Sequence, residues 1–506
     1  MTPLQMWIKS ADFWDVPYEI VDVDTMQQLD LNQYELVAAI DLKVLTSSSQ
    51  VKLDHYVRGG GKLLASGNLH SSLASYLGSI QVIEVKRGDT HRCMRISDET
   101  TLGNWNTGEI LFFTNTYQSS GKDYVIDNIA ELQAQRCCES CEVTVVDVDL
   151  EQWGKWRETT EPSLITKDVG AGKIVYTPLC LGEMEWVVQP RVPTFTEFPY
   201  VVRNNGIMLL IRDIFALTTG SDRFECRPLW QDGAKCVVVL SGDVHDYAQI
   251  PGRADREYRD MIDNMNILRE YGLDGKATWF ITGDVARKFP EEVREAADRN
   301  YEICPHTHQD TCYSNEGWDY YTQKDDISRC IDSFKTTIPN IHDYAKGFRT
   351  HGYNSNYDTR LALENLGYDY IADLQGWELS GTYNRNQPDH VITYVSLPQY
   401  ATDYRGRKLN LLEIPDTVAN DHFVYRIEKM TPDQALAFYK EGFDRMYRLG
   451  GMFQTCLHPY ISIKEDPERE RVYRGLIEHM VSHENVVFLL MKDLCGWWKE
   501  REVLNS

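Results

Sequence analysis

The sequence predicts an α/β protein of two domains, with a parallel α/β barrel in the second. Between residues 236 and 490, short apolar and β-branched runs alternate with longer amphipathic stretches, which gives six or seven βα units. A separate strand, helix and strand pattern occupies residues 34–67. A chain of 506 residues exceeds one ordinary core, and the segment TTGSD at residues 218–222 has the composition of a linker. We therefore expect domains at residues 1–220 and 221–506.

Composition excludes several classes of partner. Hydrophobic residues make up 42% of the chain, and the formal net charge is −24, so we expect neither nucleic acid nor an anionic membrane surface as a partner. The N-terminal residues have no apolar core behind a basic start, and no window reaches the 18 or so apolar residues of a membrane span. The twelve cysteines are scattered, which favours reduced thiols. Together these features predict a cytoplasmic protein without a membrane span.

The first domain is predicted to contain a parallel sheet. The expected elements are strands at 18–23, 34–40 and 62–67, a helix at 49–58, further strands at 80–85, 109–114 and 142–148, and a closing helix at 204–217. Glycines 59–61 follow the first helix, where glycine supplies a left-handed cap. The helix and its two flanking strands therefore form a βαβ unit, and the later strands are interpreted as insertions around the same sheet.

Two segments of this domain, YVRGGGKLLASG (56–67) and GAGKIVYTPLCLG (170–182), carry a family resemblance. They resemble the glutamine-amidotransferase-like, flavodoxin-like domain found beside the catalytic domains of some carbohydrate enzymes. Active amidotransferases have a cysteine at the strand-to-helix turn, where this chain reads Ala65-Ser66-Gly67-Asn68. The resemblance covers about the first 215 residues and implies a non-catalytic supporting domain, through which the chain could form a homo-oligomer.

The second domain alternates strands and helices. Strands are expected at 237–240, 277–281, 301–304, 345–349, 370–372, 411–414 and 452–456, helices at 257–271, 291–300, 358–366 and 431–449, and a last helix and strand within 472–490. Polar residues follow several of these strands: Asp243, His245 and Asp246, then His306, His308 and Asp310, then Arg349 and His351, then Asp373, and finally His458. Ligands of α/β folds bind beyond the carboxyl ends of strands, so these residues predict a hydrolytic metal site.

Residues 230–503 resemble the polysaccharide deacetylases, the nodulation-protein-B homology group of carbohydrate esterases. The motifs that carry the resemblance are LSGDVHDY (240–247), HTHQD (306–310), FRTHGY (348–353), DLQGW (373–377), LHP (457–459) and the ending VFLL (487–490) with GWW (496–498). The resemblance implies a distorted (β/α)7 barrel. It also implies a carbohydrate substrate and one divalent metal ion, for which zinc is expected.

The resemblance assigns the metal site and the base. Asp243 matches the general base, and the adjacent metal position falls on His245 or Asp246. His306 and Asp310 match the two ends of the family's His-Ser/Thr-x-x-His motif, with Asp310 in place of the last histidine. If His245 replaces the family's acidic ligand, the set is two imidazoles and one carboxylate, which suits a hydrolytic zinc or similar ion.

The other motifs imply roles for the remaining groups. Arg349 matches the arginine that pairs with the base, and His458 matches the general acid, with Asp373 holding its tautomer. Three residues are expected to bind substrate: Trp377 and Leu457, which would line the acetyl slot, and Tyr353, in the groove-wall motif. We interpret His308, His351 and His422 as pocket or surface residues that do not bind the metal.

These features predict hydrolytic removal of N-acetyl groups from an amino-sugar-containing saccharide or polysaccharide. Two alternatives remain open. Cyclic-amide hydrolases use the same barrel, so the chain could hydrolyse another non-peptide C–N bond. The departures in the metal and arginine motifs could instead belong to an inactive barrel that serves carbohydrate binding or assembly.

Overall fold

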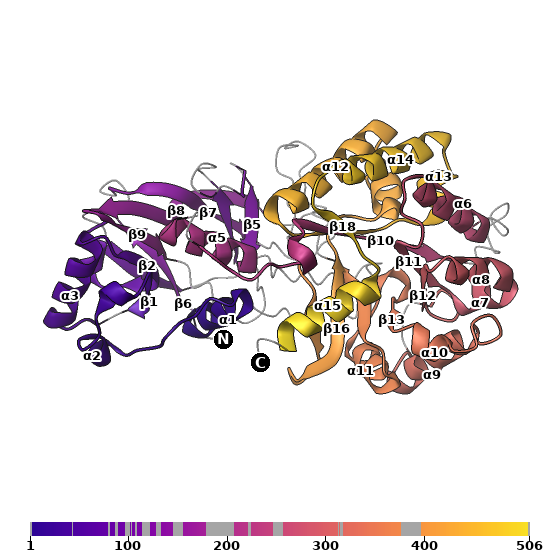
Figure 1. The fold of residues 1–506 in the computed structure, drawn as a ribbon, viewed down its shortest axis with the longest axis horizontal. Coiled ribbons are helices and arrows are strands. Elements are labelled where there is room, and N and C mark those ends of the chain that lie inside the picture. Colours follow the sequence, from indigo (N-terminus) through magenta and orange to yellow (C-terminus); the bar gives the residue numbers. More distant parts are fainter. Residues whose placement is uncertain are drawn as a thin grey trace.

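The computed structural model consists of two lobes that lie side by side (Figure 1). It describes residues 3–503 except 43, 79–80, 87–89, 97–101, 103, 107–108, 114–121, 128–132, 145–154, 179–206, 221–223, 246–256, 312, 314–316 and 376–395. Both lobes combine helices and strands, so the predicted α/β class is confirmed. None of the described helices is both long enough and apolar enough to cross a bilayer.

A seven-stranded sheet forms the N-terminal lobe. Its order is β1 (Val37–Leu42), β2 (Lys62–Leu69), β9 (Gly172–Thr177), β8 (Lys155–Val169), β7 (Gln135–Thr144), β4 (Thr90–Ile96) and β5 (Ile110–Phe113). Strands β1, β2 and β9 are parallel, and the other pairs are antiparallel. Helix α3 (Ser47–Arg58) joins β1 to β2, which confirms the predicted βαβ unit. Strands β3 (Gln81–Lys86) and β6 (Lys122–Asp127) pair separately.

The strand predicted at residues 18–23 is wrong. The chain there is irregular as far as Asp22, whose carboxylate accepts a hydrogen bond from the Thr25 backbone N–H and starts helix α2 (Val23–Met26). Ile20 is 57% exposed and Tyr18 is 48% exposed. The segment is rich in aromatic and β-branched residues, but the structure gives it no strand partner and little burial.

Two sheets form the C-terminal lobe. One contains β12 (Glu302–Pro305), β11 (Ala277–Ile281), β10 (Cys236–Val244) and β17 (Met452–Cys456), with β18 (Val486–Phe488) also paired to β10. The other contains β13 (Gly347–Phe348), β14 (Tyr370–Gln375), β16 (Lys408–Asp416) and β15 (Gln399–Thr402). All of these pairs are parallel except β15 with β16.

The two sheets contact each other through two pairs of strands. Strand β12 lies beside β13, and the Arg349 N–H lies 3.4 Å from the Pro305 carbonyl oxygen. Strand β16 lies beside β17, and the Thr417 N–H lies 2.8 Å from the Gln454 carbonyl oxygen. The parallel strands therefore bring their carboxyl ends to one region of the lobe.

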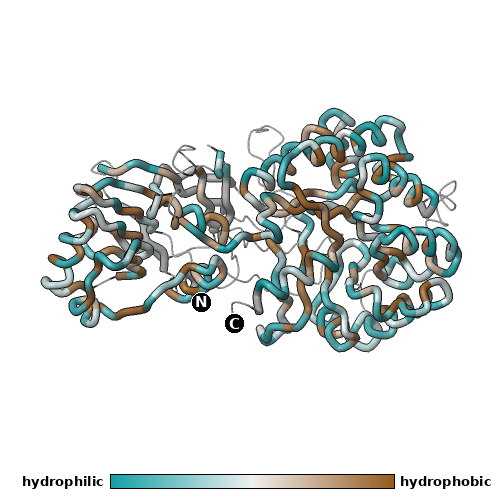
Figure 2. Tube along the Cα trace, in the orientation of Figure 1, coloured by the Kyte–Doolittle hydropathy of each residue, from teal (hydrophilic) through white to brown (hydrophobic). Residues whose placement is uncertain are grey.

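Helices surround these strands. They are α6 (Glu257–Glu270), α7 (Gly283–Lys288), α8 (Pro290–Asp298), α9 (Tyr320–Asp332), α10 (Ile341–Tyr344), α11 (Tyr357–Leu366), α12 (Pro432–Leu449), α13 (Pro459–Ile463), α14 (Pro467–Val481) and α15 (Met491–Val503). Helix α12 has a capping box between Thr431 and Gln434 and ends at Gly450, whose φ of 72° suits glycine. All nine residues of β10 are buried, and Figure 2 shows hydrophobic strands inside a shell of more hydrophilic helices.

The lobes share buried contacts at their junction. Helices α1 (Pro3–Trp14) and α5 (Ile207–Thr219) pack together there, and the Trp14 indole N–H donates to the Met208 carbonyl oxygen at 2.8 Å. The buried Arg501 of α15 donates to the Phe13 carbonyl oxygen at 2.7 Å. One continuous cluster of buried apolar residues extends through both lobes. The N-terminal lobe is therefore packed against the C-terminal lobe.

Candidate metal centre

Four strand ends of the C-terminal lobe bring ionisable side chains together. Asp243 is the penultimate residue of β10, and His245 directly follows the strand. His306, His351 and His458 come just after β12, β13 and β17. Because these strands run parallel to their neighbours, their carboxyl ends face the same region. Gly242 permits this close approach, since a Cβ there would lie 2.4 Å from the Leu457 carbonyl oxygen.

Three imidazoles converge in this region. One ligand atom from each of His245, His306 and His351 lies within 4.8 Å of the others. The ring centroids are 4.9 Å apart for His245 and His306, and 5.2 Å apart for His245 and His351. His351 was predicted to be a pocket or surface residue, but the structure places it in the cluster. The sequence feature that could have indicated this is the position of His351 just after a predicted strand.

Hydrogen bonds fix which nitrogens carry lone pairs. The His306 Nδ1 lies 3.0 Å from the Arg349 carbonyl oxygen, which can only accept, so Nδ1 carries the proton. The His306 Nε2 is then a buried lone pair, and it has no hydrogen-bond partner among the described residues. The His245 Nδ1 lies 2.6 Å from the Asp310 carboxylate, which by the same reasoning leaves the lone pair of His245 on Nε2. These donors suit a divalent metal ion.

Burial keeps the rings of His306 and His351 neutral. It lowers the pKa of His306 to about 3, although Asp243 opposes this shift. Burial and the neighbouring His245 lower the pKa of His351 to about 4. Neutral imidazole is the form that binds a metal, so both rings are ready to act as ligands near pH 7.

Asp310 lies beside this cluster. Burial alone would raise the pKa of its carboxyl, but His245 and His351 oppose burial and bring the value to about 2. The Asp310 Oδ1 lies 2.6 Å from the His245 Nδ1 and 3.7 Å from the His351 Nδ1. The structure therefore brings together three imidazoles with an adjacent carboxylate, where the sequence predicted His306 and Asp310 together with either His245 or Asp246 as the ligands.

Asp243 forms a buried ion pair with Arg349, as predicted. The Arg349 Nη1 lies 2.8 Å from the Asp243 Oδ1, and the other Asp243 oxygen lies 3.6 Å from the His306 Nε2. Burial would raise the pKa of Asp243, but His306 and Arg349 outweigh it and hold the value well below its usual range. Arg349 is itself fixed, since it donates to the Ser241 hydroxyl at 3.1 Å and to the Asp416 carboxylate at 3.3 Å.

The predicted partner of His458 is wrong. Asp421 holds this ring: its Oδ1 lies 2.6 Å from the His458 Nδ1, and its Oδ2 accepts the His458 backbone N–H at 2.7 Å. Burial would lower the pKa of His458, but Asp421 outweighs burial and raises it. Asp373 instead accepts hydrogen bonds from the backbone N–H and hydroxyl of Thr350, and burial raises its pKa to about 7.

The signal for Asp421 was present in the sequence. It lies five residues beyond Asp416, the last residue of β16, and the rule that polar residues follow strands applies to both. No site residue was predicted after the strand expected at residues 411–414. Both carboxylates are fully buried.

The remaining predicted residues are placed as follows. Leu457 is buried, and its N–H donates to the Ser241 carbonyl oxygen at 2.8 Å. Tyr353 is also buried, and its hydroxyl donates to Asp416. His308 lies outside the described metal-binding clusters, with its backbone N–H donating to Asp326 at 3.0 Å. Asp246 and Trp377 fall outside the described residues.

Three residues beside the site have left-handed backbones. The φ values are 60° for Thr307, 42° for Asp310 and 56° for Tyr353. This region is unfavourable for β-branched and bulky residues and tends to occur at functional sites. At Thr307 and Asp310 it shapes the loop that carries His306.

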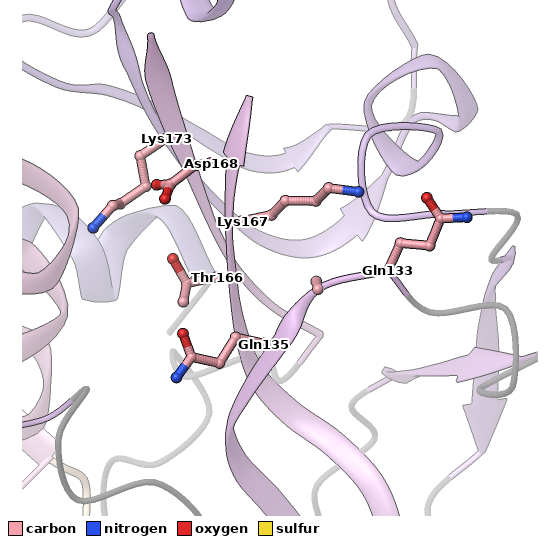
Figure 3. A pocket seen from close by; sticks show the side chains of 7 residues that line it. Gln133, Gln135, Thr166, Lys167, Asp168 and Lys173 are labelled. Atoms are coloured by element: carbon pink, nitrogen blue, oxygen red, sulfur yellow. The ribbon is translucent and has the colours of Figure 1, made fainter. Parts of the chain in front are cut away.

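A separate open cavity of about 460 Å³ lies in the N-terminal lobe (Figure 3). Its lining is polar and includes Thr166, Lys167, Asp168 and Lys173. Lys167 and Lys173 extend in different directions, so their charges do not converge on one point. This cavity and the metal centre belong to different lobes.

These features define the candidate site as a histidine-rich metal centre flanked by an Asp–Arg pair and an Asp–His pair, in an α/β lobe. Residues 259–371, within the C-terminal lobe, match the family model described as polysaccharide deacetylase. Residues 13–71 match a second model, described as the second domain of GLMA-like proteins. The amidotransferase-like character of the N-terminal lobe stays a prediction.

Comparisons with individual proteins give further similarities. The chain is 30% identical over 180 residues to a peptidoglycan deacetylase-like protein, FGM2, of Gibberella zeae, covering 34% of this chain and 48% of that protein. The match thus spans about half the length of this curated relative. Among solved structures, Agd3, a carbohydrate deacetylase, is 9% identical with a TM-score of 0.42 and covers 99% of this chain and 86% of its own. PuuE allantoinase is 16% identical with a TM-score of 0.44, and the match covers 56% of this chain and 96% of the allantoinase chain.

Proposed function

We propose that this protein is a metal-dependent hydrolase that releases acetate from N-acetylated amino sugars in a saccharide or polysaccharide. The observation that carries the proposal is the convergence of three groups at one set of strand ends. They are the three imidazoles of the cluster, the Asp243–Arg349 pair and the Asp421–His458 pair. The match of residues 259–371 to the polysaccharide deacetylase family model supports the reaction class.

His245, His306 and His351 would hold the metal, with zinc as the expected ion. Their donor set fits such an ion, because the His306 Nε2 is buried without a partner and hydrogen bonds leave lone pairs on the His245 and His306 Nε2 atoms. When bound, a divalent ion would polarise the acetyl carbonyl and make water more acidic. Asp310 would orient His245 through its Nδ1, a supporting contact common around metal ligands.

Asp243 would act as the general base. Its carboxylate stays ionised because of the buried ion pair with Arg349, so it can accept a proton from the attacking water. Arg349 holds the base in place through its bonds to Ser241 and Asp416. The water oxygen then bonds to the acetyl carbon.

His458 would act as the general acid. Asp421 fixes the proton on Nδ1 and favours the protonated ring, which leaves the Nε2–H for the leaving nitrogen. As the C–N bond breaks, this proton passes to nitrogen, and the products are acetate and the free amine. Leu457 and Trp377 would line the acetyl slot, with Tyr353 and Asp373 supporting the surrounding loops.

We also propose a distorted (β/α)7 barrel for the C-terminal lobe. The strands would follow the order β10, β11, β12, β13, β14, β16 and β17 and return to β10. The contacts of β12 with β13 and of β16 with β17 support this closure. The N-terminal lobe would support the barrel without catalysing the reaction.

The test is acetate release from N-acetylglucosamine and N-acetylgalactosamine oligomers by the zinc-loaded protein, with allantoin as a cyclic-amide comparison. Release of acetate together with an equal amount of free amine supports the proposal. Hydrolysis of the cyclic amide alone would assign the site to a different C–N bond. Zinc binding without any hydrolysis would favour the alternative of a binding protein.

A further inference from the structure

We propose a second metal site, formed by Asp444, His479 and His483 on the outside of the C-terminal lobe. One ligand atom from each of the three lies within 4.8 Å of the others. The His479 Nε2 lies 2.6 Å from the Asp444 Oδ1, and the His483 Nε2 lies 3.7 Å from the same oxygen. The site is separate from the catalytic centre, and the inference does not rest on the proposed function.

Two packed helices position these ligands. Asp444 lies in α12, and His479 lies in the last turn of α14, which packs against α12. His483 lies two residues beyond the end of α14, in the turn that follows the helix. The two ring centroids are 4.8 Å apart.

Aromatic neighbours hold the rings in place. The Phe443 ring lies 5.7 Å from His479 and 5.0 Å from His483, both in edge-on contacts. Tyr447 makes a further edge-on contact with His483 at 4.8 Å. Such contacts restrict ring rotation and so reduce the entropy that ligands would lose on binding.

The hydrogen bonds point the lone pair of His483 towards Asp444. The His483 Nδ1 lies 2.8 Å from the His479 carbonyl oxygen, which can only accept, so Nδ1 carries the proton of the neutral ring. The lone pair is then on Nε2, the atom that faces the Asp444 carboxylate. A lone pair and a carboxylate oxygen repel each other, and a cation between them would remove this repulsion. The His479 Nε2 donates its proton to the same Asp444 oxygen at 2.6 Å, and a bound cation would replace that proton. A backbone carbonyl on the other nitrogen is the usual support of a metal-binding histidine.

The chemistry of the donors identifies the class of ion. Two imidazoles and one carboxylate favour zinc or another late first-row divalent cation over magnesium or calcium. Asp444 is 51% exposed, while His479 and His483 are 22% and 24% exposed, so an ion can enter and water can complete its coordination.

The position of the cluster indicates a structural role. Asn485, two residues after His483, accepts the Lys235 N–H at 2.9 Å, and this contact lies at the start of β10. Asp243 lies near the other end of that strand, which spans roughly 25 Å at about 3.3 Å per residue. A bound ion would fasten α12 to α14 and to the loop that enters β18, away from the catalytic groups.

The test is zinc content per chain in full-length protein without a histidine tag, after chelation, reloading at micromolar zinc and gel filtration. We expect two equivalents in the wild type and one in the H479A/H483A variant. His342→Ala is the matched control, since His342 also forms an exposed pair with an aspartate, Asp332, at 3.2 Å. This control should keep two equivalents. D444N, which preserves shape, should bind the second zinc roughly tenfold or more weakly.

The two proposed metal sites can be tested independently of each other. Wild-type zinc content in H479A/H483A, or binding of the second zinc only at millimolar concentration, would overturn this inference. His306→Ala should remove the other equivalent, and its failure to do so would count against the proposed function while leaving this site intact. Thermal unfolding gives a second readout: zinc should raise the Tm of H306A and should not raise that of the H306A/H479A/H483A protein. An equal rise in both proteins would also contradict the inference.

Discussion

The Asp421 Oδ1 lies 2.6 Å from the Nδ1 of His458, and the same carboxylate accepts the His458 backbone N–H. One buried side chain therefore fixes both the tautomer of the ring and the path of the loop that carries it. The ring of His458 in turn stacks on His245, with centroids 5.4 Å apart. This pair connects the predicted general acid to the metal centre.

Asp421→Asn should lower kcat strongly, because asparagine can donate to Nδ1 and so favour the wrong tautomer. General acid catalysis contributes roughly 100-fold to 10,000-fold, and we expect a loss within that range. Steady-state acetate release is the measurement, with Asp373→Asn as the control. An equal loss of kcat in both variants would restore Asp373 as the partner that matters.

Arg349→Lys should destabilise the protein. Lysine cannot bond Asp243, Ser241 and Asp416 together, so buried carboxylates would lose a partner. Breaking a buried pair costs about 3 kcal/mol or more. Chemical denaturation measures this change. Arg407→Lys, in the exposed Arg407–Glu364 pair, should change the free energy of unfolding by less than about 1 kcal/mol. Similar losses of unfolding free energy in both variants would contradict the stabilising role of the buried Arg349 hydrogen bonds.

His351→Ala should weaken zinc binding at the catalytic centre roughly tenfold or more, whereas His308→Ala should not. The difference follows from geometry, since His351 belongs to the imidazole cluster and His308 does not. Competition with a zinc chelator measures both affinities. If instead His308→Ala weakens binding and His351→Ala has no effect, the family-like spacing of His306 and its neighbours predicts the ligands better than the structure does.

Asp373→Asn should change how stability depends on pH. Burial raises the pKa of Asp373 to about 7 in the folded protein, against about 3.9 in an unfolded chain. The folded state therefore keeps this proton to higher pH, and this group makes the wild type less stable as pH rises from about 4 to 7. Asparagine lacks this ionisation. Relative to wild type, the free energy of unfolding of the variant should rise by roughly 2–3 kcal/mol between pH 5 and pH 8 in denaturation experiments. If the difference in free energy of unfolding between variant and wild type is the same at pH 5 and pH 8, Asp373 titrates normally.

The sequence predicted the parts of the fold and site that depend on local pattern. The β10 strand with Asp243 and His245 at its end is an example, because a buried β-branched run followed by polar residues has few other interpretations. The pairing of Arg349 with Asp243 followed from a family resemblance. Residues 18–23 show the opposite case, because a run rich in aromatic and β-branched residues forms a strand only where a strand partner and a core exist.

The partners of the functional groups were harder to predict because they depend on loop paths. Asp421 reaches His458 from a loop beyond β16, and Asp373, which matches the family motif, is held by Thr350 instead. His351 joins the cluster because the chain after β13 turns through Gly352 and Tyr353, both with positive φ. Such tertiary geometry is not encoded in the spacing of one motif.

The most direct test of the account is a zinc titration of the metal-free H479A/H483A protein, which keeps only the catalytic site, with acetate release from an N-acetylglucosamine oligomer as the readout. The account predicts no activity without metal, a linear rise with added zinc, and a break at one equivalent that His306→Ala abolishes. Full activity of the chelated protein, or zinc bound at one equivalent with no acetate released from any N-acetylated sugar, would contradict the central claim.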